Sequence, residues 1–216
     1  MMVESIATQC EATSLTTYEK FLLTEYNNIA QAHFNTKSAI ATFFKHYLLI
    51  VSVPVSISMI VFGKEQFNLS HYYAKVIIGL IPIVFITISI VGFLVMLYIV
   101  NLDCDAILYA RTVNGIRKYF VKISGLDLSQ LKDILTLPID VKKPAYGSFH
   151  SLSFVIVAFA LINTLYLYIG LAVRRELIDF RYINLISFTI FMLHFIIVKY
   201  YIGYLEKKHL ALPAEL

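Results

Sequence analysis

Four long apolar stretches constrain the fold of this chain more than any other feature. They cover residues 43–62, 76–101, 152–173 and 184–205. Each is long enough for an α-helix to cross the hydrocarbon core of a bilayer, which is roughly 30 Å thick. Only 15% of the residues are charged, whereas soluble domains carry roughly a quarter. We therefore predict an all-α integral membrane protein with four transmembrane helices.

The spacing of these stretches predicts two transmembrane hairpins joined by a long polar segment. Thr16 and Glu19 have the spacing of a helix-capping box, and the next Pro or Gly is Pro54, so one helix is expected from about residue 17 into the membrane. The expected parts are an N-terminal tail and cytoplasmic amphipathic helix (1–42), a first hairpin (43–101), a basic cytoplasmic segment (102–150), a second hairpin (151–205) and a tail (206–216).

The N-terminal helix carries two patterns that run along its length. Residues spaced alternately four and three apart predict a seam that packs against another helix; they are Leu22, Tyr26, Ile29, His33, Thr36, Ile40, Phe43 and Tyr47. A second strip is mostly polar and continues into the membrane; it consists of Ser38, Thr42, Lys45, Leu49, Ser52 and Ser56. This strip either lines a pore or holds hydroxyls that bond back to their own helix and let neighbours pack closely.

The distribution of Lys and Arg predicts the orientation in the membrane. Twelve of these cations lie in the N-terminal region, the middle segment and the C-terminal end, and five lie in the two short loops at 64, 75, 174, 175 and 181. Because cytoplasmic loops carry the excess of Lys and Arg, both termini and the middle segment are expected in the cytoplasm.

The middle segment contains a basic stretch that is the expected ligand-binding site. Drawn as a helix, residues 109–123 place apolar side chains on one face and a polar stripe on the other. The polar residues are Arg111, Asn114, Arg117, Lys118 and Lys122. Three roles suit such a stripe: contact with lipid phosphates, binding of a nucleotide or other polyanion, and contact with acidic residues elsewhere in the protein.

Two polar residues lie deep in the last two apolar stretches. They are Asn163 and His194. Polar side chains within a membrane are candidates for function. A hydrogen bond between two neighbouring helices is the expected role, and a proton or ion relay is the alternative.

Motifs of enzymes are missing from the sequence. It contains no P-loop, dinucleotide fingerprint, nucleophile elbow or zinc-protease helix. Asp103, Asp105 and Arg111 follow a membrane helix, as in the CDP-alcohol phosphotransferases, but the Asp-Gly of that motif is absent and Asp127 has no acid four residues later. The two cysteines and six histidines form no ligand cluster. We therefore expect no enzyme activity, no metal and no cofactor.

Two segments of this chain resemble a family of small bacterial membrane proteins. The segments are LYARTVNGIRKYF, after the second apolar stretch, and EYNNIAQAHFNT, before the first. The family occurs in antiphage defence loci, beside nucleotidyltransferases, and its nearest members are the membrane effectors of the Hailong system. The resemblance implies an oligomeric ion channel in the bacterial inner membrane, controlled by a nucleotide or DNA oligomer that the partner nucleotidyltransferase makes.

The sequence thus predicts a ligand-gated channel or pore-forming effector that assembles as a homo-oligomer, with a tetramer as the expected stoichiometry. Two other classes of function remain. A secondary transporter would use the polar residues in the middle of the membrane, although the chain shows only one broken-helix signal, at Pro54. A non-conducting anchor would use the seam of the N-terminal helix to dock a soluble partner.

Overall fold

The chain forms a bundle of long helices. The computed structural model describes residues 16–63, 71–124, 140–146, 151–174 and 178–211, and within them all regular structure is helical. The helices are α1 (Thr17–Gly63), α2 (His71–Ser124), α4 (Ser151–Ala172) and α5 (Phe180–Ala211). All four are long and apolar enough to cross a membrane. The predicted all-α class and the four candidate spans are confirmed. Within the predicted middle segment, residues 125–139 and 147–150 lie outside the described residues.

Helices α1 and α2 are much longer than a bilayer requires. They contain 47 and 54 residues, or about 70 and 80 Å at a rise of 1.5 Å per residue. The predicted continuity of α1 is confirmed. Helix α2 begins at His71, before the expected start of its apolar stretch, and continues without interruption through the basic stretch to Ser124. At the start of α1 the capping box is present, since the Thr16 N–H donates to Glu19 Oε2 at 2.7 Å and the Glu19 N–H donates to Thr16 Oγ1 at 3.3 Å.

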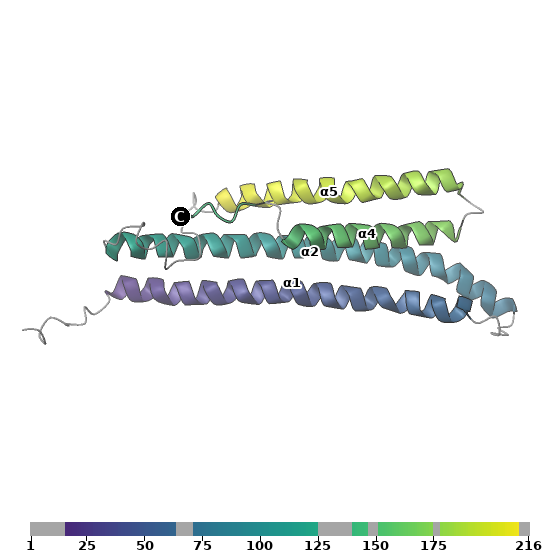
Figure 1. The fold of residues 1–216 in the computed structure, drawn as a ribbon, viewed down its shortest axis with the longest axis horizontal. Helices are drawn as coiled ribbons and strands as arrows, with labels where there is room; N and C mark the ends of the chain where they lie inside the picture. Colours follow the sequence, from purple (N-terminus) through teal and green to yellow (C-terminus); the bar gives the residue numbers. More distant parts are fainter. Residues whose placement is uncertain (1–15, 64–70, 125–139, 147–150, 175–177, 212–216) are drawn as a thin grey trace, which may run out of the picture.

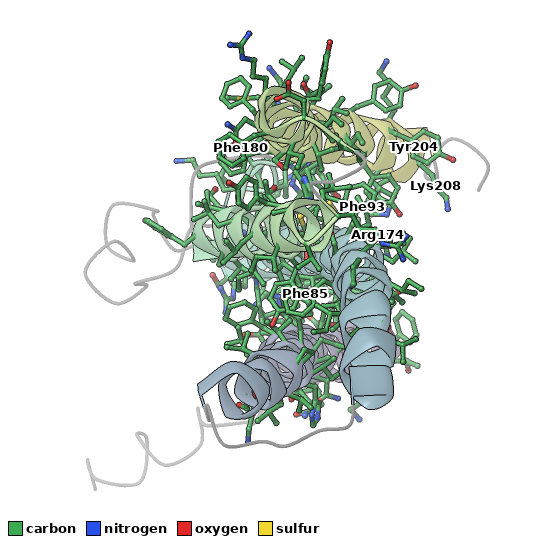
Figure 2. The ribbon with its side chains drawn as sticks, turned by 90° about the vertical axis from the view of Figure 1, so that its right-hand side faces the viewer. Phe85, Phe93, Arg174, Phe180, Tyr204 and Lys208 are labelled. Carbon is green, nitrogen blue, oxygen red and sulfur yellow. The ribbon has the colours of Figure 1, made fainter. Side chains whose placement is uncertain are left out.

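Helix α2 is the centre of the bundle. It packs against α1, α4 and α5. Viewed along the bundle, α1 and α5 lie on opposite sides, with α2 and α4 between them (Figure 2). Helix α4 covers only part of α2, and the C-terminal portion of α2 continues beyond it beside the N-terminal portion of α1 (Figure 1). The molecule is therefore a four-helix bundle at one end and a two-helix projection at the other.

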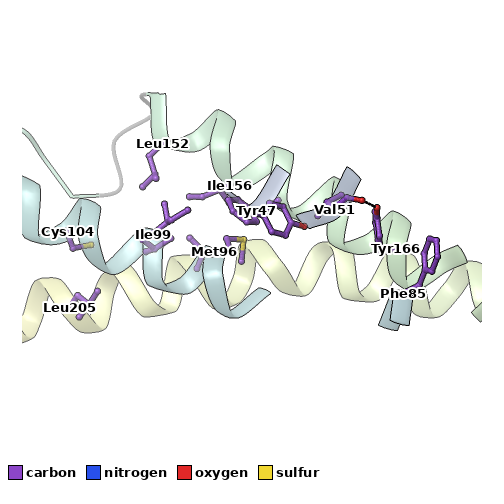
Figure 3. Packing of buried hydrophobic residues seen from close by; sticks show 13 residues of the cluster. Tyr47, Val51, Phe85, Met96, Ile99, Cys104, Leu152, Ile156, Tyr166 and Leu205 are labelled. Carbon is purple, nitrogen blue, oxygen red and sulfur yellow. Dashed lines mark hydrogen bonds between the residues drawn. The ribbon is translucent and has the colours of Figure 1, made fainter. Parts of the chain in front are cut away.

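The core of the bundle is apolar and aromatic (Figure 3). Phe159, Met96 and Ile99 are almost completely buried. The ring of Tyr47 stacks on Phe159 with centroids 4.3 Å apart, and the hydroxyl of Tyr166 donates to the backbone oxygen of Val51. Large apolar side chains also cover the outer surface, as is expected of helices that face lipid; among them are Leu94, Leu161, Leu185 and Ile196.

The predicted seam of α1 packs against α2 along the projection. Tyr18, near the start of α1, meets the ring of Tyr119 edge-on at 5.6 Å. One seam residue, His33, places Nδ1 3.0 Å from the backbone oxygen of Ala106. Between these points and the core, Lys37 donates to Asp103 Oδ1 at 2.6 Å, and the Asp103 carboxylate is buried. The seam is therefore occupied by the chain's own second helix.

Candidate functional site

The basic stretch lies on the C-terminal half of α2, in the two-helix projection. Its predicted apolar face is confirmed at Val113 and Ile116, which are buried. The prediction of a solvent-exposed polar stripe is wrong at Asn114, which is only 4% exposed. The physical reason is a segment from later in the chain, residues 140–146, which lies across α2 at this point; we call it the strap.

Two residues of the predicted stripe hold the strap by its backbone. The side-chain amide of Asn114 donates to the backbone oxygens of Lys143 at 2.9 Å and Asp140 at 3.3 Å. Arg111 Nε donates to the backbone oxygen of Pro144 at 2.9 Å. Carbonyl groups of a segment outside regular structure need such donors wherever water is excluded. Arg111 and Asn114 are therefore engaged in a structural contact that the sequence pattern did not reveal.

The strap also connects Arg111 to α5. The Arg111 guanidinium lies 4.3 Å from the centre of the Tyr146 ring, an attractive cation–π geometry. The Tyr146 hydroxyl lies 2.9 Å from His209 Nδ1, and His209 Nε2 lies 3.7 Å from Asp105 Oδ1. Burial raises the pKa of the Tyr146 hydroxyl, while the nearby Arg111 charge acts in the opposite direction. Tyr146 thus remains neutral and joins α2 to the end of α5.

Arg117 is turned toward α1. It donates from a terminal nitrogen to the Tyr26 hydroxyl at 3.0 Å, and its guanidinium lies 5.6 Å from the centre of the same ring. Tyr26 belongs to the seam of α1. Arg117 therefore joins the two helices of the projection and is partly withdrawn from solvent.

Among the described residues of α2 and the strap, four lysines are the exposed cations near the basic stretch. Lys118 and Lys122 on α2 are exposed, as are Lys142 and Lys143 on the strap. The strap lies against α2 at Gly115, where an added Cβ would come within 3.7 Å of Val141. Because Lys118 is one helical turn beyond Asn114, the strap brings its two lysines to the side of α2 that carries Lys118. An exposed group of ammonium ions of this kind suits phosphate groups, for which Lys acts as a point charge.

The polar strip of α1 faces outward. All six of its members are exposed in the single chain: Ser38, Thr42, Lys45, Leu49, Ser52 and Ser56. The Ser52 hydroxyl donates to the Leu49 oxygen at 2.8 Å and the Ser56 hydroxyl donates to the Ser52 oxygen at 2.9 Å. The protons of these two hydroxyls are already bonded within their own helix. The strip can therefore face lipid, another subunit or water.

Asn163 and His194 come together at the centre of the bundle. The Asn163 side-chain amide lies 3.5 Å from His194 Nε2, and His194 Nδ1 lies 2.7 Å from the Ile190 oxygen. The Tyr47 hydroxyl donates to Asn163 Oδ1 at 2.5 Å, and Asn163 is 0% exposed. The interhelical Asn–His contact that the sequence predicted is present, and Tyr47, which the prediction missed, completes it.

Gly92 brings α2, the fourth helix, into contact with Tyr47 and Asn163. A Cβ at Gly92 would lie 2.0 Å from Asn163 Oδ1 and 2.7 Å from the Tyr47 hydroxyl, closer than any real contact. Only a residue without a side chain lets α2 approach the hydrogen bond so closely. We call Tyr47, Gly92, Asn163 and His194 the polar node; it takes one residue from each of the four helices. A glycine inside an apolar helical stretch was the signal for it in the sequence.

Potential metal ligands are not gathered anywhere in the part of the chain that the structure describes, since no three His, Cys, Asp or Glu residues lie close enough together. Comparison with protein-family models, curated proteins and solved structures gave no match. The class of this protein rests on its fold: an all-helical chain with four helices able to span a membrane.

The polar node predicts a sharp difference between two glycines. Gly92→Ala is expected to lower the free energy of unfolding by about 1–3 kcal/mol, the usual effect of overpacking a filled core. Gly79→Ala is the matched control, because nothing lies within 4 Å of a Cβ added there. Thermal unfolding in detergent measures both. Equal midpoints for the two variants would contradict the close approach of α2 to Asn163.

The strap predicts a local effect of removing its donor. Asn114→Ala should raise the hydrogen–deuterium exchange of residues 140–146 by roughly tenfold, because two hydrogen bonds contributing about 0.5–1.5 kcal/mol each are lost. Thr112→Ala is the control, since the Thr112 hydroxyl is exposed and bonds to Leu108 of its own helix. Unchanged exchange in the Asn114 variant would show that the strap is held by other contacts.

Proposed function

We propose that this chain is the subunit of a homo-oligomeric ion channel or pore-forming effector of the bacterial inner membrane, controlled by a polyanionic ligand at the cytoplasmic end of α2. The observation that carries the proposal is the continuity of α2. One unbroken helix connects the exposed Lys118 and Lys122 to Gly92 in the polar node. A ligand on the lysines therefore acts on the same rigid element that contacts the three other helices.

The exposed lysines favour a polyanion as the ligand. Lys118 and Lys122 lie one and two helical turns beyond Asn114, which holds the strap that carries Lys142 and Lys143. In one subunit such a group of point charges binds phosphate weakly, whereas a symmetric assembly repeats it around an axis. A nucleotide or DNA oligomer made by a partner nucleotidyltransferase, in a role in antiphage defence, is the ligand that the family resemblance implies.

The proposed pore requires several copies of the chain. The four helices of one subunit pack on each other through an apolar core, in which Met96, Ile99 and Phe159 are buried, so ions would pass between subunits. The polar strip of α1 is exposed and extends into the apolar stretch as far as Ser52 and Ser56. In a hairpin topology with both termini in the cytoplasm, a tetramer would place four such strips around its axis.

A second candidate is a non-conducting anchor for a soluble partner. The favouring observation is the exposed aromatic side chains on the N-terminal portion of α1, where Phe21 is 61% and Phe34 is 70% exposed. Exposed apolar groups of this size often mark interaction surfaces. The seam expected to dock the partner is covered by α2, so this partner would bind the exposed flanks of α1 that carry Phe21 and Phe34.

The site assignment predicts the effect of reversing two charges. Lys118→Glu combined with Lys122→Glu should weaken binding of a fluorescent single-stranded DNA oligomer to the detergent-purified protein by roughly tenfold or more, since each cation near a phosphate contributes about 1 kcal/mol. The same variant should lose control of conductance in liposomes by that oligomer. Both side chains are exposed, so thermal stability should remain unchanged.

The matched control reverses the exposed pair Lys207 and Lys208 at the end of α5. It should leave oligomer binding intact. Equal binding by the wild type and the α2 variant would overturn the ligand site, whereas tight capture of a soluble protein without any measurable conductance would select the anchor.

The proposed pore predicts water access to the strip of α1. In a Cys10→Ser background, Ser52→Cys and Ser56→Cys should react with a charged, membrane-impermeant thiol reagent and reduce conductance. Ile50→Cys is the control, because Ile50 is 56% exposed on a different side of α1 and should face lipid. The native Cys104 is buried, so the background itself should not react. Reaction at residue 50 but not at residues 52 and 56 would place the pore elsewhere.

A further inference from the structure

A groove between the start of α4 and the C-terminal half of α5 lies next to the strap, which contributes Tyr146 to its lining. It encloses about 490 Å³ and opens to the outside of the bundle. Figure 1 shows the two helices lying side by side here. Its deeper part is apolar, with Ile156 and Val157 on α4 and Phe195 and Ile202 on α5. Apart from Tyr146 of the strap, every residue that lines the groove belongs to one of two candidate membrane spans.

Two polar residues of the groove, Ser153 and Tyr146, lie where α4 begins. Ser153 is the third residue of α4, so its backbone N–H has no acceptor within the helix and the positive end of the helix dipole is near. Tyr146, just before α4, lines the same end. Since α4 has 22 residues, about the number needed to cross the hydrocarbon core, its first turn marks the membrane–water boundary.

One cation and one anion of α5 face this polar end. Lys199 and Glu206 both line the groove, and they are two helical turns apart. Neither has a hydrogen-bond or ion-pair partner among the described residues. A cation at the edge of the hydrocarbon is costly unless it reaches water or an anion. The groove thus presents one positive and one negative charge, both without a partner among the described residues, next to its apolar part.

We propose that the groove binds one molecule of a phospholipid whose headgroup carries both a phosphate and a primary ammonium, as in phosphatidylethanolamine. Lys199 and the Ser153 N–H bind the phosphate. Glu206 accepts hydrogen bonds from the ammonium, with which it is complementary in charge. One acyl chain lies between Val157 and Phe195. This inference rests on the membrane location of α4 and α5 and is independent of channel activity.

Gly203 provides a way to fill the groove without disturbing the protein. It lines the groove, and nothing lies within 4 Å of a Cβ added to it. A Gly203→Leu side chain would enter the groove between Lys199 and Glu206, where the headgroup binds, while meeting no protein atom at its base. Gly79→Leu is the matched control, since Gly79 is equally open but belongs to α2.

The test uses the lack of tryptophan in the chain. Leu161 lies on α4 one turn beyond Val157 and is exposed, so Leu161→Trp is a unique fluorescent reporter beside the groove. Phosphatidylethanolamine with brominated acyl chains is titrated into the detergent-purified protein, and the saturable part of the quenching is measured. A second reporter, Leu94→Trp on α2, should show only weak, non-saturating quenching.

The expected result is saturable quenching that weakens at least tenfold in Lys199→Ala and in Gly203→Leu and is unchanged in Lys207→Ala and Gly79→Leu. Brominated phosphatidylglycerol, which lacks the ammonium, should bind more weakly than phosphatidylethanolamine, and Glu206→Gln should remove that difference. Quenching that never saturates, or saturates equally in all variants, would overturn the lipid site. Equal binding of both lipids by the wild type would overturn the role of Glu206.

Discussion

The hydrogen bond between Tyr47 and Asn163 is the contact on which the arrangement of the four helices depends. An amide in the middle of an apolar bundle must find partners, because leaving it unpaired costs several kcal/mol in such surroundings. Tyr47 supplies a donor from α1 and His194 supplies a partner from α5. Because these directional contacts act over about 3 Å, they select one register for each helix, whereas apolar packing alone tolerates many.

The close approach of Gly92 to the Tyr47–Asn163 contact explains why α2 can be both central and continuous. Most side chains at position 92 would push α2 away from the Tyr47–Asn163 contact, and the glycine allows the approach. From there α2 continues without interruption to Ser124. The Lys37–Asp103 ion pair and the contact of Arg117 with Tyr26 hold α1 to it beyond the four-helix part. The strap and the end of α5 are added to this two-helix frame through Arg111, Asn114 and Tyr146.

Local patterns in the sequence predicted the helices well. The capping box at Thr16 and the absence of Pro and Gly from residues 93–113 involve only near neighbours, and both agree with the two continuous helices. The Asn163–His194 contact was also predictable, because two isolated polar groups in adjacent apolar helices have few other partners. Other contacts between segments that are distant in the sequence were not predictable. Asn114 lies on the polar stripe by helical position, yet it is buried by backbone atoms 26 and 29 residues away, and no periodicity records such a contact.

The length of α2 has a mechanical consequence. Helix α2 remains in contact with α5 as far as Asp105, through His209, and from there to Lys122 it measures about 25 Å. Arg117 and Tyr26 hold α1 beside this part of α2, so the two helices of the projection would tilt together. A tilt of about 5° around Asp105 would move the tip by about 2 Å. The pair would then act as a lever, and a force at its lysine-bearing tip would reach the four-helix part as a torque.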